Sequence, residues 1–368
     1  MPAVSSGLGL VTGASGFVAV HVVKELLGRG YQVRGTVRSC GMLKLYYLAG
    51  LKSRFYIQKD KGDYLVKKFP SGLEYAIVED VEAEGGFDRA LKGVDAVEHI
   101  ASPFHYNEAD AHKVVNPAVN GTKMVLESIL KHGEKVKRVV ITSSFGSIVD
   151  SRKKRPYKFT EQDWNTESTG LLKENDKDIC PGDAYKAGKT LAEKAAWQFI
   201  KDNKPKWDWL RSARLLFSVP SCTRKSSPYC PRSPEGAAEF LQVKSPVKLN
   251  ESAGQLYGWL NGSKEGGDTS GNLVDVRDLA HAHVQAISIE EAGSKRFAVA
   301  KQPYTLQLCL DELYVDGKVM KSWLKLPKGN RGADKVEDQN GEPRCPDGIL
   351  SLWREEAKAT IQFWTLEL

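Results

Sequence analysis

A glycine-rich turn near the N-terminus constrains the fold more than any other stretch of this 368-residue chain. The sequence VTGASGFVA places Gly13, Gly16 and Ala19 in a G-x-x-G-x-x-A pattern between an apolar stretch, residues 8–12, and an amphipathic one, residues 17–30. Such a turn lets the backbone approach a pyrophosphate, which the N-terminus of the following helix then stabilises. Because the turn stands between a strand and a helix, it predicts a dinucleotide-binding βαβ unit.

The same alternation of strand-like and helix-like segments continues over the first two thirds of the chain. The strands are apolar on both faces, which is typical of a parallel sheet covered by helices on both sides. The expected fold class is therefore α/β, with a doubly wound parallel sheet of the Rossmann type. Further strands are expected at residues 31–37, 73–80, 95–101, 137–144 and 207–217, and helices around residues 86–92, around 111–132 and around Tyr185.

The end of the second expected strand carries information about the nucleotide. An NAD site usually has an aspartate or glutamate there for the ribose hydroxyls, whereas the segment GTVRS offers Arg38 and no carboxylate. A guanidinium suits the 2′-phosphate of NADP. Although an arginine at a strand end can also serve only solubility, Arg38 favours NADP over NAD.

Bulk composition narrows the class of protein. With 41% hydrophobic and 27% charged residues, the chain is typical of a globular protein. The net charge of +7 is spread along the chain, and the one basic cluster, residues 151–158, shows no helical or aromatic-interleaved pattern. A solvated loop is therefore favoured there, and no nucleic-acid partner is expected.

Cysteine usage and hydropathy bear on the compartment. No C-x-x-C pair and no ligand spacing with histidine occurs, so neither a metal site nor a disulfide framework is indicated. No apolar run approaches the roughly 20 residues of a membrane span, and the first strand begins too early for a signal peptide. We expect a cytoplasmic protein without a membrane partner. The cysteines considered are Cys40, Cys180, Cys222, Cys230, Cys309 and Cys345.

Several motifs in order along the chain give a family resemblance. They are VTGASGFVA, TVRS, VEDVEAEGGFDRALKGVDAVEHIASP, NPAVNGTKMVLES, VKRVVITSS, YKAGK and LVDVRDLAHAHVQAI. Together they resemble the extended short-chain dehydrogenase/reductases. Within that superfamily they are most similar to the fungal NADPH-dependent aldehyde and carbonyl (methylglyoxal-type) reductases, relatives of the plant dihydroflavonol and cinnamoyl-CoA reductases. Residues 8–39, 60–215 and 243–300 carry the resemblance.

The resemblance implies which residues bind NADP(H). Arg38 with Lys44 would hold the 2′-phosphate, and Asp80 and Val81 would contact the adenine. Ala101 and Ser102 would lie at the nicotinamide ribose. The residues that would hold the pyrophosphate are Gly13, Ser15, Gly16, Phe17 and Val18. Lys59 and Lys61 compete with Lys44 for the role of assisting Arg38.

The resemblance also implies a catalytic set. Tyr185 and Lys189 match the Y-x-x-x-K pair of the family, and Ser144 matches its serine, with Ser143 as the second candidate. In this chemistry hydride passes to a carbonyl carbon and Tyr185 gives a proton to the developing alkoxide. The Lys189 ammonium would lower the pKa of the tyrosine and bind the ribose, while Ser144 would hold the carbonyl oxygen. His99 is expected to be structural, because the reaction already has its acid.

The spacing of Tyr185 and Lys189 is weak evidence by itself. Residues four apart share a helical face, and such pairs occur on many helices as packing contacts. Only their occurrence together with the glycine-rich turn, Arg38 and Ser144 supports a catalytic role.

The family pattern implies a division of the chain. Residues 1–215 would form an NADP-binding domain and residues 216–368 a smaller substrate-binding portion, with residues 270–300 returning to the first domain. Three segments depart from the pattern. They are residues 40–57, which are aromatic and basic and are interpreted as an insertion, residues 218–242, rich in Pro, Ser and Cys, and residues 305–368.

The predicted function is NADPH-dependent reduction of a small aldehyde or ketone to an alcohol, by a monomer or homodimer. A nucleotide-sugar epimerase or dehydratase, or a hydroxysteroid dehydrogenase, remains an alternative on the same scaffold. The epimerases and dehydratases favour NAD, so Arg38 weighs against them. A non-catalytic NADP-binding sensor is a further alternative, because residues 218–242 stand where the family closes over the nicotinamide.

Overall fold

The computed structural model describes nine stretches of the chain. Residues 40–57 and 218–242 lie outside them, as do Lys44, Lys59 and nearly all of the 305–368 tail. The described stretches are residues 4–38, 61–102, 110–154, 157–174, 179–205, 208–216, 270–293, 295–300 and 302–305.

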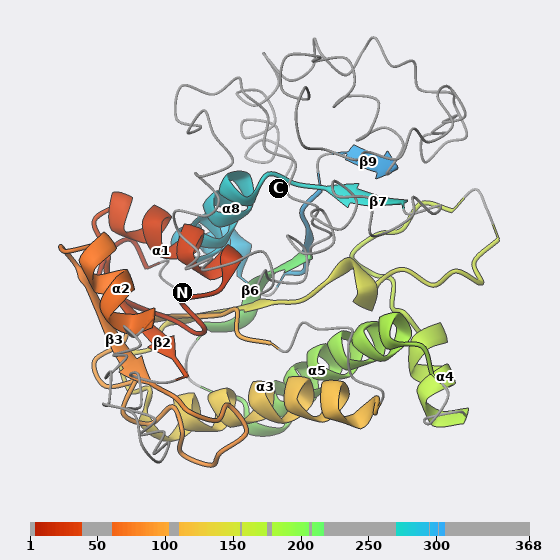
Figure 1. Cartoon of the computed structure of the whole chain (residues 1–368), viewed down its shortest axis with the longest axis horizontal. Helices are drawn as coiled ribbons and strands as arrows, with labels where there is room; N and C mark the ends of the chain where they lie inside the picture. The colour runs from red at the N-terminus through yellow and green to blue at the C-terminus, as the bar shows by residue number, and fades with distance from the viewer. Residues whose placement is uncertain are drawn as a thin grey trace, which may run out of the picture.

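A seven-stranded parallel sheet forms the centre of the described structure (Figure 1). Its spatial order is β3-β2-β1-β4-β5-β6-β8, so the order reverses between β1 and β4. Open parallel sheets bind ligands at such a reversal, beyond the carboxyl ends of the strands. The strands are β1 (Leu8–Val11), β2 (Gln32–Val37), β3 (Leu73–Ile77), β4 (Ala96–His99), β5 (Arg138–Thr142), β6 (Asp208–Leu216) and β8 (Phe297–Ala298).

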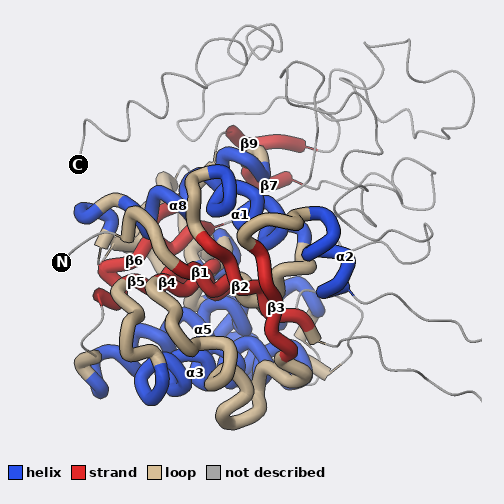
Figure 2. The backbone as a smooth tube through the Cα atoms, turned by 90° about the vertical axis from the view of Figure 1, so that its left-hand side faces the viewer, coloured by secondary structure: helices blue, strands red, loops and turns tan. Residues whose placement is uncertain are grey.

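Helices cover both faces of this sheet (Figure 2), which confirms the predicted doubly wound α/β fold. One face carries α1 (Phe17–Gly28), α2 (Lys61–Lys68) and α8 (Val276–Ser288), and the other carries α3 (His112–His132) and α5 (Pro181–Asn203). The remaining elements are α4 (Glu167–Glu174), the 3₁₀ turns η1 (Phe145–Ser147) and η3 (Glu290–Ala292), and the antiparallel pair β7 (Ser270–Leu273) and β9 (Gln302–Thr305).

The hydrophobic core is divided by the sheet into two clusters. Because successive residues of a strand point to opposite faces, Leu10 packs in one cluster with Phe87, whereas Val11 packs in the other with Val20 of α1. Val284 of α8 lies in the same cluster as Val20. The late segment that contains α8 is therefore built into the core beside the glycine-rich turn.

The helix predicted around residues 86–92 is wrong. These residues form a series of turns, in which Leu91 N donates to Phe87 O at 3.1 Å. The segment begins with Gly85, which has φ +70°, and Gly86, and glycine is unfavourable inside a helix. Conversely, the sequence patterns did not predict α2 or α4.

The described helices also bear on membrane association. Among them, none combines the length and the hydropathy that a bilayer crossing requires.

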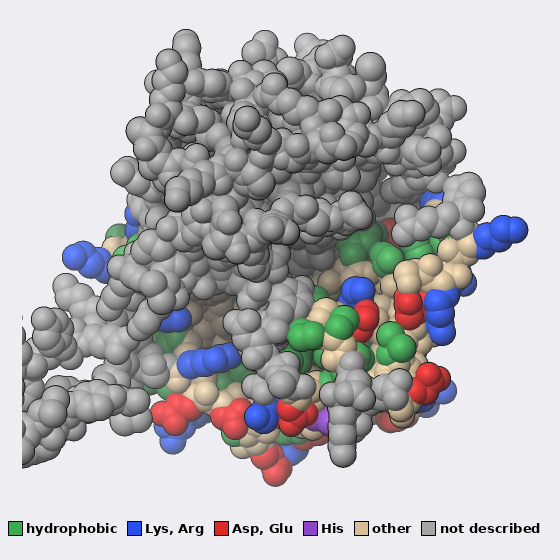
Figure 3. All heavy atoms as spheres, turned by 45° about the vertical axis from the view of Figure 1, so that its right-hand side comes forward, with side chains coloured by type: hydrophobic (Ala, Val, Ile, Leu, Met, Phe, Trp, Pro, Cys, Tyr) green, Lys and Arg blue, Asp and Glu red, His purple; other side chains and the backbone are tan. Residues whose placement is uncertain are grey.

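Figure 3 shows one face of the molecule, on which basic and acidic side chains of the described residues lie next to one another.

Candidate active site

Hydrogen bonds donated by backbone N–H groups hold the turn between β1 and α1. Gly16 N donates to Gly13 O at 2.8 Å, and Gly13 N donates to Thr36 Oγ1 at 3.0 Å. Gly13 has φ +65°, and a Cβ there would lie 3.2 Å from the Ala101 Cβ, so both conformation and space require glycine. No side chain caps α1 at Gly16, and an anion could therefore accept from its first N–H groups.

The other residues expected to bind the cofactor follow the strands in turn. Because the strands are parallel, all of them lie at the carboxyl edge of the sheet. Ser15 lies in the glycine-rich turn, and Phe17 and Val18 begin α1. Arg38 follows β2, Asp80 and Val81 follow β3, and Ala101 and Ser102 follow β4.

The residues after β2 and β3 are open to solvent. Arg38 and Asp80 are both exposed, and Asp80 Oδ1 accepts from Glu82 N at 2.8 Å, which shapes the loop after β3. Of the lysines considered as partners of Arg38, Lys61 begins α2 and is exposed. A polyanion at this edge would meet the Arg38 guanidinium without displacing a described ion pair.

The end of β4 is positioned by Thr12. Its Oγ1 accepts from Ile100 N at 3.0 Å and from Ala101 N at 2.9 Å, which uses both lone pairs. The hydroxyl hydrogen therefore goes to His99 Nδ1, 3.0 Å away, and the His99 proton sits on Nε2. Burial, together with the Lys189 charge, lowers the pKa of His99 to about 3. His99 is thus a neutral structural group, as the sequence suggested.

Ser143 and Ser144 follow β5 and have different partners. Ser143 Oγ donates to the Glu193 carboxylate in a short hydrogen bond, whereas Ser144 Oγ accepts from Gly146 N at 3.0 Å. The bond from Gly146 uses a lone pair of Ser144, whereas Ser143 gives its hydroxyl hydrogen to Glu193. This engagement of Ser143 weighs against Ser143 as the donor to a substrate oxygen.

Helix α5 carries the tyrosine and the lysine. It begins at Pro181 with Cys180 as N-cap, and Lys189 Nζ lies 5.8 Å from the centroid of the Tyr185 ring. Burial lowers the pKa of Lys189 to about 8, against the opposing charge of Glu193. Lys189 lines one small cavity with Ala101 and Ser102. The fold thus brings together predicted residues from two distant parts of the sequence.

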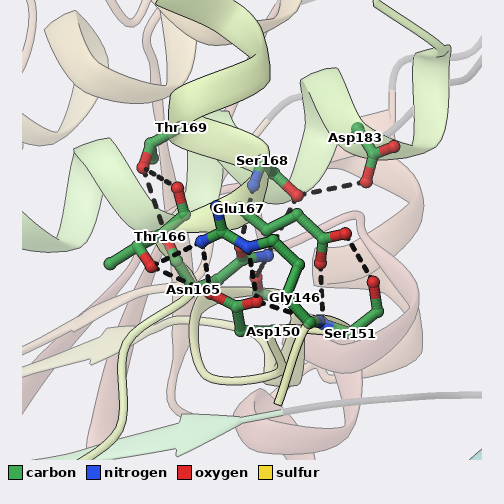
Figure 4. A network of polar contacts seen from close by, with 10 residues as sticks. Gly146, Asp150, Ser151, Asn165, Thr166, Glu167, Ser168, Thr169 and Asp183 are labelled. Atoms are coloured by element: carbon green, nitrogen blue, oxygen red, sulfur yellow. Dashed lines mark hydrogen bonds and ion pairs between the residues drawn. The ribbon is translucent and has the colours of Figure 1, made fainter. Parts of the chain in front are cut away.

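A polar network holds the turn after Ser144 against α5 (Figure 4). Asn165 Nδ2 donates to Gly146 O at 2.8 Å, and Ser168 N donates to Asn165 Oδ1 at 2.9 Å. Ser168 Oγ then donates to Asp183 Oδ1 at 3.1 Å, two residues before Tyr185. A chain of bonds therefore links the serine turn, α4 and the first turn of α5.

The same network fixes the loop that follows η1. Asp150 is buried, and its carboxylate accepts from Arg152 Nη2 and from Thr166 Oγ1, each at 2.8 Å. The hydrogen bond from Arg152 is the main reason that the pKa of Asp150 lies well below its usual value. Ser151 N donates to Glu167 at 2.7 Å, which joins this loop to α4 (Figure 4).

Sequence reasoning missed Thr12, Thr36 and Glu193. Thr12 and Thr36 stand at the ends of strands, where threonine is common. Their hydroxyls accept hydrogen bonds from the backbone, and no sequence pattern indicates this. Glu193 stands four residues after Lys189 and eight after Tyr185, on the same face of α5. That spacing could have identified it.

Comparison with known proteins gives consistent matches. Residues 10–202 match the model of the 3-beta hydroxysteroid dehydrogenase/isomerase family. Cinnamoyl-CoA reductase CAD2 of Medicago truncatula is 31% identical, with 99% of this chain and 94% of that protein covered. The NADPH-dependent methylglyoxal reductase GRE2 of Saccharomyces cerevisiae is 29% identical, with 88% and 86% covered.

A solved structure agrees with these matches. The crystal structure of Gre2 from Candida albicans in complex with NADPH superposes with a TM-score of 0.64 at 33% sequence identity. The alignment covers 88% of this chain and 86% of that one. Sequence and structure comparisons therefore identify the same group of relatives.

Proposed function

Because the chain belongs to the 3-beta hydroxysteroid dehydrogenase/isomerase family of extended short-chain dehydrogenase/reductases, we propose that it reduces an aldehyde or ketone to an alcohol with NADPH. One observation carries the proposal. The buried Lys189 ammonium lies one helical turn from Tyr185 and lines the same cavity as Ala101 and Ser102, at the point where the strand order reverses. Relatives named as NADPH-dependent reductases support the choice of reaction.

The β1–α1 turn fits a dinucleotide. A side chain at Gly13 would fill the space beside Ala101, and the uncapped α1 N-terminus offers N–H donors to a pyrophosphate. We assign the 2′-phosphate to the exposed Arg38 and the adenine edge to Asp80 and Val81. The residues proposed for the pyrophosphate are Gly13, Ser15, Gly16, Phe17 and Val18, and those for the nicotinamide ribose are Ala101, Ser102, Tyr185 and Lys189.

The bound nicotinamide supplies the hydride, and the protein supplies the proton. Tyr185 donates its phenolic proton to the oxygen as the carbonyl carbon is reduced. The Lys189 ammonium stabilises the resulting phenolate, because a positive charge nearby favours the ionised form of an acid. Ser144 donates its hydroxyl hydrogen to the substrate oxygen and stabilises the charge that develops on it.

The proposal extends to the parts of the chain that complete the site. We assign residues 1–215 to cofactor binding, with residues 40–57 as an insertion, and residues 216–368 to the substrate-binding portion, apart from residues 270–300, which return to the first domain. In support, α8 packs in the core beside α1, and β8 pairs with β6. We propose a cytoplasmic monomer or homodimer that acts on a small-molecule carbonyl substrate, with no nucleic-acid partner.

The reaction is tested by NADPH oxidation with a panel of aldehydes, ketones and ketoesters. Turnover is expected with NADPH and much less with NADH. Tyr185→Phe should lower kcat by about 10²–10⁴-fold, the usual contribution of a positioned general acid. Its Kd for NADPH should change far less than kcat, because the phenol hydroxyl acts mainly in the transition state. Tight NADPH binding by folded protein without any turnover would instead support the non-catalytic sensor.

A further inference from the structure

A buried carboxylate lies behind the proposed catalytic residues. Glu193 follows Lys189 by one turn of α5 and is 2% exposed. It lines the same small cavity as Lys189. Because residues four apart share a helical face, Tyr185, Lys189 and Glu193 form one stripe along α5. The proposed reaction, as described so far, assigns no role to this third member.

The Glu193 carboxylate is held from two sides. Ser143 Oγ donates to Oε2 in a short hydrogen bond, and Ser147 Oγ donates to the same atom at 2.7 Å. Arg296, just before β8, forms an ion pair from Nε to Oε1 at 2.7 Å, with 6% of its side chain exposed. Ser143 and Ser147 flank Ser144, at the ends of β5 and η1. Glu193 therefore connects these two ends to Arg296, in the late segment that adds β8 to the sheet.

Arg296 is itself fixed in place. Its guanidinium carbon lies 4.1 Å from the centroid of the Trp164 ring, and Nη1 donates to Glu161 O at 2.8 Å. The contact between Arg296 Nε and Glu193 Oε1 is a close ion pair and does not have the geometry of a hydrogen bond. The stacked ring and the backbone acceptor hold Arg296 in place, and the two serines hold the Glu193 carboxylate.

We propose that, in the reaction proposed above, Glu193 is a positioning residue: its carboxylate ties the serine turn to α5 and sets a fixed negative charge beside the Lys189 ammonium. It does so without contact with substrate or cofactor. The Glu193 carboxylate then positions both Ser144 and Lys189. The Ser144 hydroxyl and the Lys189 ammonium therefore keep a fixed position relative to each other and to Tyr185.

The charges around Lys189 come from several elements. His99 faces it from β4 and is neutral, and Glu193 and Tyr185 belong to its own helix. The groups that β5 and α3 place in the cavity are uncharged: Thr142, Ser143 and Thr122. Arg296 pairs with Glu193. Burial lowers the pKa of Lys189 to about 8 and Glu193 raises it, so removal of the carboxylate charge should make the ammonium lose its proton at a lower pH.

The test compares Glu193→Gln with the wild-type enzyme. In carbonyl reduction, the alkaline limb of kcat/KM should move to lower pH by about one unit, because an opposite charge that favours the ammonium is lost. NADPH affinity should stay within about twofold, since Glu193 does not touch the cofactor in this proposal. Glu193→Asp keeps the charge, so its rate should fall while the alkaline limb stays near the wild-type position.

Ser147→Ala is the matched control. It removes a hydrogen bond to the same carboxylate atom but no charge. A merely structural role for Glu193 predicts similar pH profiles for Ser147→Ala and Glu193→Gln, and that result would overturn the proposal. A shift in Glu193→Gln alone supports it. If Glu193→Gln does not fold, the double variant Glu193→Gln/Arg296→Gln removes both members of the ion pair and serves the same comparison.

A second readout does not need turnover. Acetylation of Lys189 by acetic anhydride, followed by mass spectrometry of its peptide, reports the pH at which the amine loses its proton. The inflection is expected near pH 8 in the wild type and lower in Glu193→Gln. If no carbonyl is reduced but the inflection shifts, the proposed function fails while the charge effect stands. If carbonyls are reduced and the inflection does not move, the role of Glu193 is refuted.

Discussion

The β1–α1 turn and the cluster around α5 lie at the same edge of the sheet but are built differently. In the turn, backbone N–H groups are the donors: Gly16 N bonds to Gly13 O, three residues away, and Gly13 N bonds to the Thr36 hydroxyl. In the cluster, side chains make them, and Glu193 binds serines 50 and 46 residues earlier in the chain. The turn depends on glycine conformation and space, whereas the cluster depends on buried charge and hydrogen bonds.

This difference predicts how each region fails. A substitution in the turn should act through strain and exclusion of the cofactor, and hence on binding. A substitution in the cluster removes a donor, an acceptor or a charge, and should act on the chemical step or on folding. The following experiments test that distinction, from the largest expected effect to the smallest.

After Tyr185→Phe, the largest loss of rate is expected from substitution of Ser144 in the cluster. Ser144→Ala removes a donor to the developing alkoxide and should lower kcat by about 10²–10³-fold, as the loss of one oxyanion donor does. Ser143→Ala should cost less, because Ser143 acts through Glu193. Steady-state kinetics on the two variants decide the assignment, and the opposite order of effects would transfer the catalytic role to Ser143.

In the β1–α1 turn, substitution of Gly13 should weaken NADPH binding. Gly13→Ala imposes a left-handed conformation costing about 1–2 kcal/mol and places a methyl group against Ala101, so we expect the Kd for NADPH to rise by roughly 10²-fold. Gly30→Ala is the control, because Gly30 also has positive φ, +84°, but nothing lies within 4 Å of its Cβ position. Gly30→Ala should lose stability and keep its NADPH affinity. Equal NADPH affinities for the two variants would refute the argument from space.

Arg38 tests whether binding at this edge depends on charge as well as on shape. Arg38→Gln should raise the Kd for NADPH by about 10–100-fold, since a hydrogen bond to a charged group contributes about 1.5–3 kcal/mol. The Kd for NADH should not change. Arg34→Gln is the control on the same strand, because Arg34 pairs with Glu74 at 2.6 Å and should affect stability only. An unchanged NADPH preference in Arg38→Gln would contradict the 2′-phosphate assignment.

Asp150 tests the buried charge of the cluster through pH. Its folded pKa lies below that of the unfolded chain, so its contribution is fully present above about pH 4 and is lost as the pH falls further. Asp150→Asn should cost about 1–3 kcal/mol at pH 7, with the difference in Tm from the wild type shrinking below pH 4.

Glu84→Gln provides the comparison for Asp150. Glu84 makes an exposed ion pair with Lys131 at 3.4 Å, and its loss should cost less than about 1 kcal/mol. Thermal unfolding from pH 3 to pH 7 measures both variants. A Tm difference for Asp150→Asn that is independent of pH would show that shape, rather than charge, holds the loop.

The smallest expected effect is a gain, at Gly188. Gly188 lies inside α5, and glycine inside a helix costs about 1 kcal/mol relative to alanine. A Cβ at Gly188 would lie 3.4 Å from Val115 Cα, an ordinary contact with α3. Gly188→Ala should therefore stabilise the protein by about 0.5–1 kcal/mol without loss of activity. A lower Tm would mean that α3 and α5 need the closer approach.

Much of the fold was predictable because its signals are local. The alternation of apolar strands with amphipathic helices predicted the doubly wound sheet, and the strand before Arg38 is β2 as expected. The helix predicted around residues 86–92 is not formed, because the segment begins with two glycines, Gly85 and Gly86, and glycine is unfavourable inside a helix. Helix α4 was missed because its place depends on the network around Asn165, which no sequence period encodes.

The sequence by itself determined the glycine-rich turn, the charge at the end of β2 and the placing of Tyr185 and Lys189 on one face of a helix. Each of these follows from residues within a few positions of one another, since dihedral preference and helical spacing are local properties. Only the tertiary structure decided that Ser143 donates to Glu193, and that the buried Lys189 lies one helical turn from the ion pair between Glu193 and Arg296. Burial and charge pairing depend on which distant segments the packed core brings together, and no local pattern records that choice.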